Sequence, residues 1–167
     1  MKFYGIDLHH DSFIAAIIDE NNQITTRKVS LHLKKFTEFL KELSEDDYVA
    51  VEARANSFWF YDQVIGLVKD CLVINPWKFL QIYKSNKKTD KIDAKKTPKR
   101  LRYRILCDGD EDDLPTVYVP THEVRELRSL FNSYKMLVKQ KTMVKNRIHS
   151  LLIHQGVDTP TRILFEK

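Results

Sequence analysis

The chain has 167 residues, of which 43% are hydrophobic, so it is long and apolar enough to bury one core. No apolar run approaches the roughly 20 residues that a membrane span needs, and no signal-peptide pattern opens the sequence. Cys71 and Cys107 have no metal-type spacing and no secretory context, which excludes a zinc cluster and a disulfide framework. We therefore expect a cytoplasmic protein without a membrane segment.

The positive charge is concentrated in one segment. Residues 78–104 hold eleven Lys or Arg against two Asp, a net charge of +9, whereas the whole chain carries +5. Residues 108–113 then form an acidic patch. A basic segment followed by an acidic patch indicates a polyanionic partner at one face of the protein, with a solvated lysine-rich surface as the alternative.

The chain up to residue 75 predicts a sheet of mixed direction. Short apolar or alternating runs separated by polar turns predict strands, the first three of which form an antiparallel meander. A strand, a helix and a further strand then indicate a parallel crossover. The expected strands cover residues 3–9, 12–19, 24–30, 48–53 and 71–75, and the expected helices cover residues 33–43 and 57–69. This order predicts an α/β fold of the ribonuclease H-like type, a mixed sheet flanked by helices.

The later part of the chain predicts a connector and one long helix. Residues 106–120 are acidic and rich in turn-forming residues. Thr121 is suited to cap a helix, apolar residues recur from Leu127 to Leu151 at alternating spacings of three and four, and Gly156 supplies a stop. The resulting helix of about 34 residues would be roughly 50 Å long. We expect a coiled-coil arm that pairs with a second copy or with a later segment, the alternative being a helix folded back on the sheet.

Four acidic residues indicate one site. Asp7 lies inside the first apolar run, and Glu52 lies at the carboxyl end of the strand expected beside it. Such carboxylates are costly unless they are paired or bind a metal, and ligand sites in α/β sheets gather at the carboxyl ends of strands. Asp90 and Asp93 are three residues apart, a spacing that places both on one face of a helical turn. Taken singly, Asp7 is explained as a strand-end cap, Glu52 as an edge residue and Asp90 as a helix N-cap.

Converging carboxylates repel one another, so a cation among them is expected at neutral pH. Hard oxygen ligands favour Mg²⁺ or Mn²⁺, and two such ions support phosphoryl transfer on a phosphodiester. Basic residues around Asp90 and Asp93 are suited to hold the backbone of a nucleic acid. These candidate nucleic-acid-binding residues are Lys87, Lys88, Lys91, Lys95, Lys96, Lys99 and Arg100.

Five motifs follow one another over most of the chain. They are Gly5–Asp11, Val51–Ala53, Val73–Pro76, Lys88–Ala94 and Lys145–Gly156. In this order they resemble the DEDD insertion-sequence transposases, the family of the pilin-gene invertases and the RNA-bridged recombinases. Lys88–Ala94 is the most specific of the five.

The resemblance implies a RuvC-like nuclease fold in which Asp7, Glu52, Asp90 and Asp93 chelate Mg²⁺. It also implies cutting and rejoining of DNA in transposition or site-specific recombination, with a structured guide RNA as a further partner in RNA-bridged members. Full-length members carry, after the coiled coil, a second domain whose serine is thought to act as nucleophile. Because this chain stops before such a domain, we expect metal and nucleic-acid binding from it and not strand transfer by this chain alone.

We therefore expect four segments. Residues 1–105 form a RuvC-like catalytic domain, 106–120 an acidic linker, 121–156 a long coiled-coil helix, and 157–167 a tail leading to the absent serine domain. The chain departs from the family after Ala94, where a smooth helix rich in Leu and Ala is replaced by a segment that contains Pro98. We expect a new helix there, with Thr97 as N-cap and Pro98 as its first residue, continuing through Arg104.

Three other functions fit parts of this pattern. A truncated, non-catalytic transposase would bind nucleic acid and dimerise through its last helix, although the intact acids oppose decay. A Holliday-junction resolvase-like endonuclease on the same fold would cleave branched DNA with Mg²⁺. An actin-like sugar kinase or phosphatase would need glycine-rich phosphate loops, which four Gly in the whole chain do not provide.

Two groups of side chains are assigned ordinary roles. His9 and His10 follow Asp7, and we expect them to be polar surface or supporting groups and not metal ligands. The aromatic residues at helical spacing are expected to lie in the core and not to stack on bases. They are Phe58, Trp59, Phe60, Trp77 and Phe79.

Overall fold

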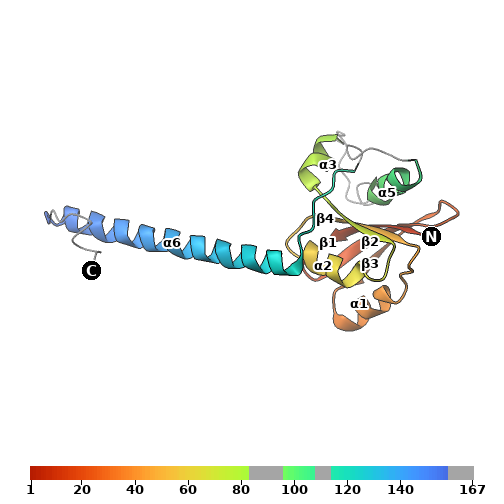
Figure 1. Ribbon diagram of the computed structural model, residues 1–167, viewed down its shortest axis with the longest axis horizontal. Helices are drawn as coiled ribbons and strands as arrows, with labels where there is room; N and C mark the ends of the chain where they lie inside the picture. Colours follow the sequence, from red (N-terminus) through yellow and green to blue (C-terminus); the bar gives the residue numbers. More distant parts are fainter. Residues whose placement is uncertain (83–95, 108–113, 158–167) are drawn as a thin grey trace. The chain divides into compact units, whose positions relative to one another are not determined.

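The computed structural model describes residues 1–82, 96–107 and 114–157. The chain divides into two compact units, Met1–Val119 and Pro120–Lys167. The first unit contains a five-stranded sheet with helices, and the second contains one long helix (Figure 1). None of the described helices is long and apolar enough to cross a membrane.

The sheet has the mixed topology that the sequence predicts. Its strands are β1 (Phe3–Leu8), β2 (Ser12–Ile18), β3 (Ile24–Ser30), β4 (Tyr48–Glu52) and β5 (Asp70–Ile74). They lie in the order β3-β2-β1-β4-β5. The first three form an antiparallel meander, and β4 and β5 run parallel to β1. The predicted α/β fold, with its RuvC-like (ribonuclease H-like) sheet and long final helix, is confirmed.

Helices cover both faces of this sheet. They are α1 (Leu33–Leu40), α2 (Ser57–Val64), α3 (Pro76–Ile82) and α5 (Lys96–Leu106), and the second unit contains α6 (His122–His154). On one face Tyr4 of β1 packs in a cluster with Phe36 of α1 and Phe60 of α2. On the other face Phe3 packs in a cluster with Leu101 of α5. Successive side chains of β1 point to opposite faces of the sheet and therefore contribute to both parts of the core.

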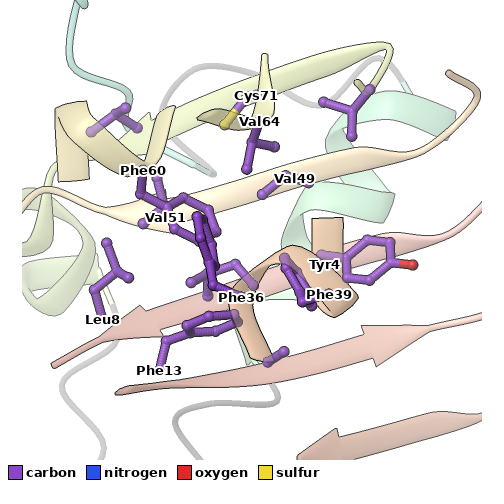
Figure 2. Packing of buried hydrophobic residues seen from close by; sticks show 14 residues of the cluster. Tyr4, Leu8, Phe13, Phe36, Phe39, Val49, Val51, Phe60, Val64 and Cys71 are labelled. Carbon is purple, nitrogen blue, oxygen red and sulfur yellow. The ribbon is translucent and has the colours of Figure 1, made fainter. Parts of the chain in front are cut away.

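Aromatic rings form the centre of the core between the sheet and α1 and α2 (Figure 2). The ring of Phe13 packs edge-on against the rings of Phe36, Phe39 and Phe60, with centroids 6.2, 4.9 and 5.5 Å apart. Tyr4 packs edge-on against Phe39 at 6.1 Å. Edge-to-face pairs add to the stability that ring burial provides. These contacts hold α1 and α2 on the face opposite to α5.

The second predicted helix is shorter than its apolar pattern indicated. We expected residues 57–69, but α2 ends at Val64. The chain then turns, with the amide of Leu67 donating to the carbonyl of Val64 at 2.8 Å, and Val68 is still buried in the core. The apolar pattern therefore ran past the end of the helix because Val68 is buried although it lies in the following turn. The first helix is also shorter, because α1 ends at Leu40 and not at residue 43.

The predicted cap of the helix near Pro98 is wrong. The helix α5 already contains Thr97 and Pro98, both of which are buried, and it continues to Leu106. Pro98 lies in the first turn of the described helix. Backbone amides there have no partner within the helix, so the missing N–H of Pro98 costs little stability. The first turn of α5 is therefore packed against the protein and is not an exposed cap.

The prediction that the helical aromatic residues lie in the core holds for some of them. Phe60 and Phe79 are buried, whereas the indole of Trp77 is exposed. Residues two positions apart on a helix point in nearly opposite directions, so Phe79 and Trp77 cannot both face the core. Trp59 is half-exposed, and the centroid of its ring lies 5.1 Å from that of the Phe36 ring.

The described end of the expected connector packs on the edge of the sheet. Leu114 is fully buried, and Thr116 forms a bridge with Ile74 of β5. The amide of Asn75 donates to the carbonyl of Pro115 at 2.8 Å, and the amide of Val117 donates to the carbonyl of Val73 at 2.7 Å. This short segment therefore belongs to the first compact unit and satisfies backbone groups that an edge strand would otherwise expose.

The helix α6 begins and ends with the signals found in the sequence. The hydroxyl of Thr121 accepts a hydrogen bond from the amide of Val124, as an N-cap does. After the helix, Gly156 has a φ of +74°, the left-handed conformation that commonly ends a helix. No residue between His122 and His154 is buried.

Candidate functional site

Asp7 and Glu52 lie at the carboxyl ends of two neighbouring parallel strands. β1 and β4 are in register up to the pair Ile6 and Val51, and the two acids are the next residue on each strand. Strand alternation places Asp7 on the same face as Gly5 and Glu52 on the same face as Ala50. That is the face covered by α5 and not the one covered by the aromatic cluster.

The guanidinium of Arg54 lies between these two carboxylates. Its Nη2 atom is 3.1 Å from Oδ1 of Asp7 and 3.6 Å from Oε2 of Glu52. The side chain of Arg54 is 45% exposed, and those of Asp7 and Glu52 are 30% and 26% exposed. One cationic group is therefore shared by two partly buried anions at neighbouring strand ends.

One oxygen of Asp7 has an unusual environment. Oδ1 is buried, and it accepts no hydrogen bond from any residue that the structure describes. The nearby Nη2 of Arg54 is within ion-pair distance but does not form a hydrogen bond with it. The other oxygen, Oδ2, lies 3.6 Å from Nε2 of His9. A buried carboxylate oxygen without a hydrogen-bond donor is costly in a purely structural role and is suited to bind a cation.

A network of hydrogen bonds fixes the loop that carries Arg54. The buried hydroxyl of Ser57 donates to the carbonyl of Arg54 at 2.9 Å and accepts from its amide at 3.2 Å. The side-chain amide of Asn56 donates to the carbonyl of His9 at 3.1 Å, which joins this loop to the end of β1. The backbone of Arg54 is thus held in place by its neighbours, although its side chain is half-exposed.

Close packing brings the start of α5 to the same face. A Cβ atom on Gly5 would lie 2.4 Å from Cδ of Pro98 and 2.9 Å from Cβ of Thr97. Since Gly5 is two residues before Asp7 on β1, the first turn of α5 lies close to the carboxylate pair. The absence of a side chain at residue 5 permits this approach.

The other predicted site residues are divided between described and undescribed parts of the chain. Lys96, Lys99 and Arg100 lie on α5. Within residues 1–82, 96–107 and 114–157 there is no cluster of three or more His, Cys, Asp or Glu side chains that could hold a metal. The predicted site residues outside the described ranges are Asp90, Asp93, Lys87, Lys88, Lys91 and Lys95.

The sequence analysis missed Arg54. It also missed the contact between Gly5 and Pro98. The signal in the sequence that could have indicated Arg54 is a basic residue two positions after Glu52, just beyond the end of a strand. No local pattern indicates that residues 5 and 98 touch.

Comparison with known proteins gives one family. No curated protein matches the chain. The family model of the IS110-type DEDD transposases, described as Transposase, matches residues 4–154, which include the described sheet from Tyr4 onward and α6 to its end. Because this match covers far more than half of the sequence, the chain belongs to the DEDD transposases of IS110-type insertion sequences.

Proposed function

We propose that this transposase-family chain carries out metal-dependent phosphoryl transfer on DNA with a site formed by Asp7, Glu52, Asp90 and Asp93. The observation that carries the proposal is the buried Oδ1 atom of Asp7, which lacks a hydrogen bond among the described residues and lies at a strand end beside Glu52. The donor set consists of carboxylate oxygens, which suit Mg²⁺ or Mn²⁺. Membership of a transposase family supports DNA cleavage and transfer in general.

Covalent geometry supports the inclusion of Asp93. Thr97 packs against Gly5, close to Asp7 on the same face of β1. Asp93 is four residues before Thr97, and an extended chain spans at most about 3.6 Å per residue, so their Cα atoms are within about 14 Å of each other. Asp90 is three residues further away along the chain. Chain length therefore does not prevent either acid from belonging to one site with Asp7 and Glu52.

The chain's own residues would bind the cation and the nucleic-acid backbone. Asp7 and Glu52 would hold the cation from two adjacent strands, which fixes its position relative to the sheet. Bound there, the cation would supply charge stabilisation to the attacking and leaving oxygens of a phosphodiester. The basic residues around Asp90 and Asp93 would bind phosphates on the same side. Three of the candidate basic residues, Lys96, Lys99 and Arg100, lie on α5.

The proposal includes the partners of the whole protein. We propose that residues 1–119 form the nuclease domain and that α6 pairs in a coiled coil, because its apolar stripe is exposed along its length. A serine domain after the helix, and a structured guide RNA as a second nucleic acid, are proposed from the family resemblance.

Mn²⁺ titration by calorimetry tests the metal site. We expect Asp7→Asn to abolish Mn²⁺ binding while the circular dichroism spectrum is unchanged, because the substitution removes one charged ligand and no core contact. Asp46→Asn makes the same chemical change at an exposed position and should leave the affinity unaltered. Unchanged affinity in Asp7→Asn would refute the site. Asp90→Asn tests the part outside the described residues, since loss of binding there supports the four-acid site.

Gel shifts and cleavage assays distinguish the nucleic-acid functions. The substrates are duplex DNA, four-way junctions and structured RNA, each with and without Mg²⁺. Cleavage of DNA that requires Mg²⁺ and Asp7 supports the proposal. Binding without cleavage, even with a serine domain supplied, would favour a non-catalytic role, and cleavage confined to junctions would favour a resolvase-like nuclease.

A further inference from the structure

The arginine beside the carboxylate pair has no place in the proposed ligand set, yet it lies where a cation would bind. Its Nη2 atom is within 3.1 Å of Asp7 and within 3.6 Å of Glu52. We infer that Arg54 is an internal counter-ion of these acids, holding them together without metal and leaving them when a divalent cation binds. This inference rests on the proposed function, because it requires a metal site at Asp7 and Glu52.

Electrostatics makes the guanidinium and a divalent cation competitors. Both are attracted to the same two carboxylates, and a divalent ion bound between those carboxylates would repel the guanidinium at contact distance. A cation held by Asp7 and Glu52 would therefore compete with Arg54 for the same carboxylate oxygens. The free energy of the Arg54 contacts opposes metal binding and lowers the affinity of the site.

The contacts of Arg54 are of a kind that is readily exchanged. The approach of Nη2 to the buried Oδ1 of Asp7 is an ion pair without a hydrogen bond between them. The guanidinium is also 45% exposed, so water can solvate it after it moves away. An ion pair with these properties contributes modestly to overall stability while still neutralising the two acids.

The backbone beneath this side chain is well fixed. Ser57 binds both the amide and the carbonyl of Arg54, and Asn56 joins the loop to the carbonyl of His9. The guanidinium therefore starts from a defined position and can move by rotation of its own side chain. A mobile cation on a fixed backbone is what an exchangeable counter-ion requires.

The test compares Mn²⁺ affinity with thermal stability in the 167-residue chain. We expect Arg54→Gln to bind Mn²⁺ about fivefold more tightly than the unsubstituted chain, a change typical of losing one partly exposed ion pair. In EDTA, Arg54→Gln should melt at a lower temperature, because the two acids then lack their counter-ion. Arg54→Lys, which keeps the charge, should give intermediate values.

Arg27→Gln is the matched control. Arg27 forms an ion pair with Glu42, and its side chain is exposed to a similar extent, but Arg27 lies on β3, which β2 separates from β1. We expect Arg27→Gln to leave the Mn²⁺ affinity unchanged. A tightening in both variants would reflect overall charge alone and would overturn the inference.

The outcomes separate this inference from the proposed function. If the unsubstituted chain binds Mn²⁺ and Arg54→Gln binds it with equal or weaker affinity, the counter-ion role is overturned and the metal site stands. Unsubstituted chain that binds no Mn²⁺ would overturn both. A merely structural role for Arg54 predicts lower stability and weaker binding together, so opposite changes in the two quantities support the inference.

Discussion

The strand β1 and the helix α6 use similar apolar side chains in opposite environments. Ile6 and Leu8 of β1 are almost completely buried, whereas Leu127 and Leu130 of α6 are 66% and 69% exposed. The first unit contains both sides of its own core, because helices cover each face of the sheet. Between His122 and His154 the helix presents its side chains to solvent. The sheet unit is thus stabilised by its own contacts, while the helix leaves its apolar side chains exposed.

The two proposed functions, metal binding at the carboxylate pair and pairing through α6, place different demands on the structure. The carboxylate pair requires fixed geometry, and it lies at the ends of central strands that the core holds in register. The exposed stripe of α6 requires only a regular helix, which local signals at Thr121 and Gly156 already specify. Changes in the core should therefore affect folding, and changes in the stripe should affect association.

The largest effect is expected from a truncation in the aromatic core. Phe60 is fully buried, and its ring contacts those of Phe13, Phe36 and Phe39. Phe60→Ala should lower the free energy of unfolding by about 3–5 kcal/mol, because it removes apolar contacts and leaves a cavity. Urea unfolding followed by circular dichroism measures this change. A loss below about 1 kcal/mol would mean that the core is not packed as described.

A smaller effect is expected where α5 meets β1. Gly5→Ala would place a methyl group 2.4 Å from Cδ of Pro98, so the helix or the strand must shift. We expect a loss of about 1–3 kcal/mol in the free energy of unfolding, typical of overpacking. Gly66→Ala is the matched control, because no atom of the described residues, apart from its chain neighbours, lies within 4 Å of its added Cβ. Equal effects of the two substitutions in urea unfolding would contradict the close contact.

The sheet and its two acids could be predicted because their signals are local. Alternation and turns locate the strands, and a carboxylate at the end of an apolar strand is anomalous by itself. Asp7 and Glu52 were predicted as members of one site, and the structure brings them to adjacent positions on parallel strands. Whether they bind a metal is a prediction that the Mn²⁺ titration tests.

The features that the sequence did not predict depend on contacts between distant segments. The contact of Gly5 with Pro98 joins residues far apart in the chain, and no periodicity indicates it. Arg54 pairs with Asp7 because the loop after β4 is tied to the carbonyl of His9 at the end of β1. The pairing of Thr116 with Ile74 involves one short segment at a sheet edge, too short to show alternation.

The smallest effect on folding is expected from charges placed on the stripe of α6. Leu130→Glu with Leu137→Glu puts two carboxylates, seven residues apart, at exposed apolar positions. The free energy of unfolding of the sheet unit should change by less than about 0.5 kcal/mol, as for exposed sites generally. The affinity of the proposed pairing through α6 should fall at least about tenfold, or about 1.4 kcal/mol, because a charge within a coiled-coil seam loses its hydration. Sedimentation velocity over a range of concentrations measures this affinity.

The control for this experiment places the same charges on the opposite side of the helix. Asn132→Glu with Asn146→Glu adds two carboxylates at exposed positions away from the stripe, so association should persist. A sedimenting mass of 19.8 kDa for the unsubstituted chain at every concentration would contradict pairing between copies. The exposed leucines would then require a different partner segment, because a stripe of this length is costly to leave in water.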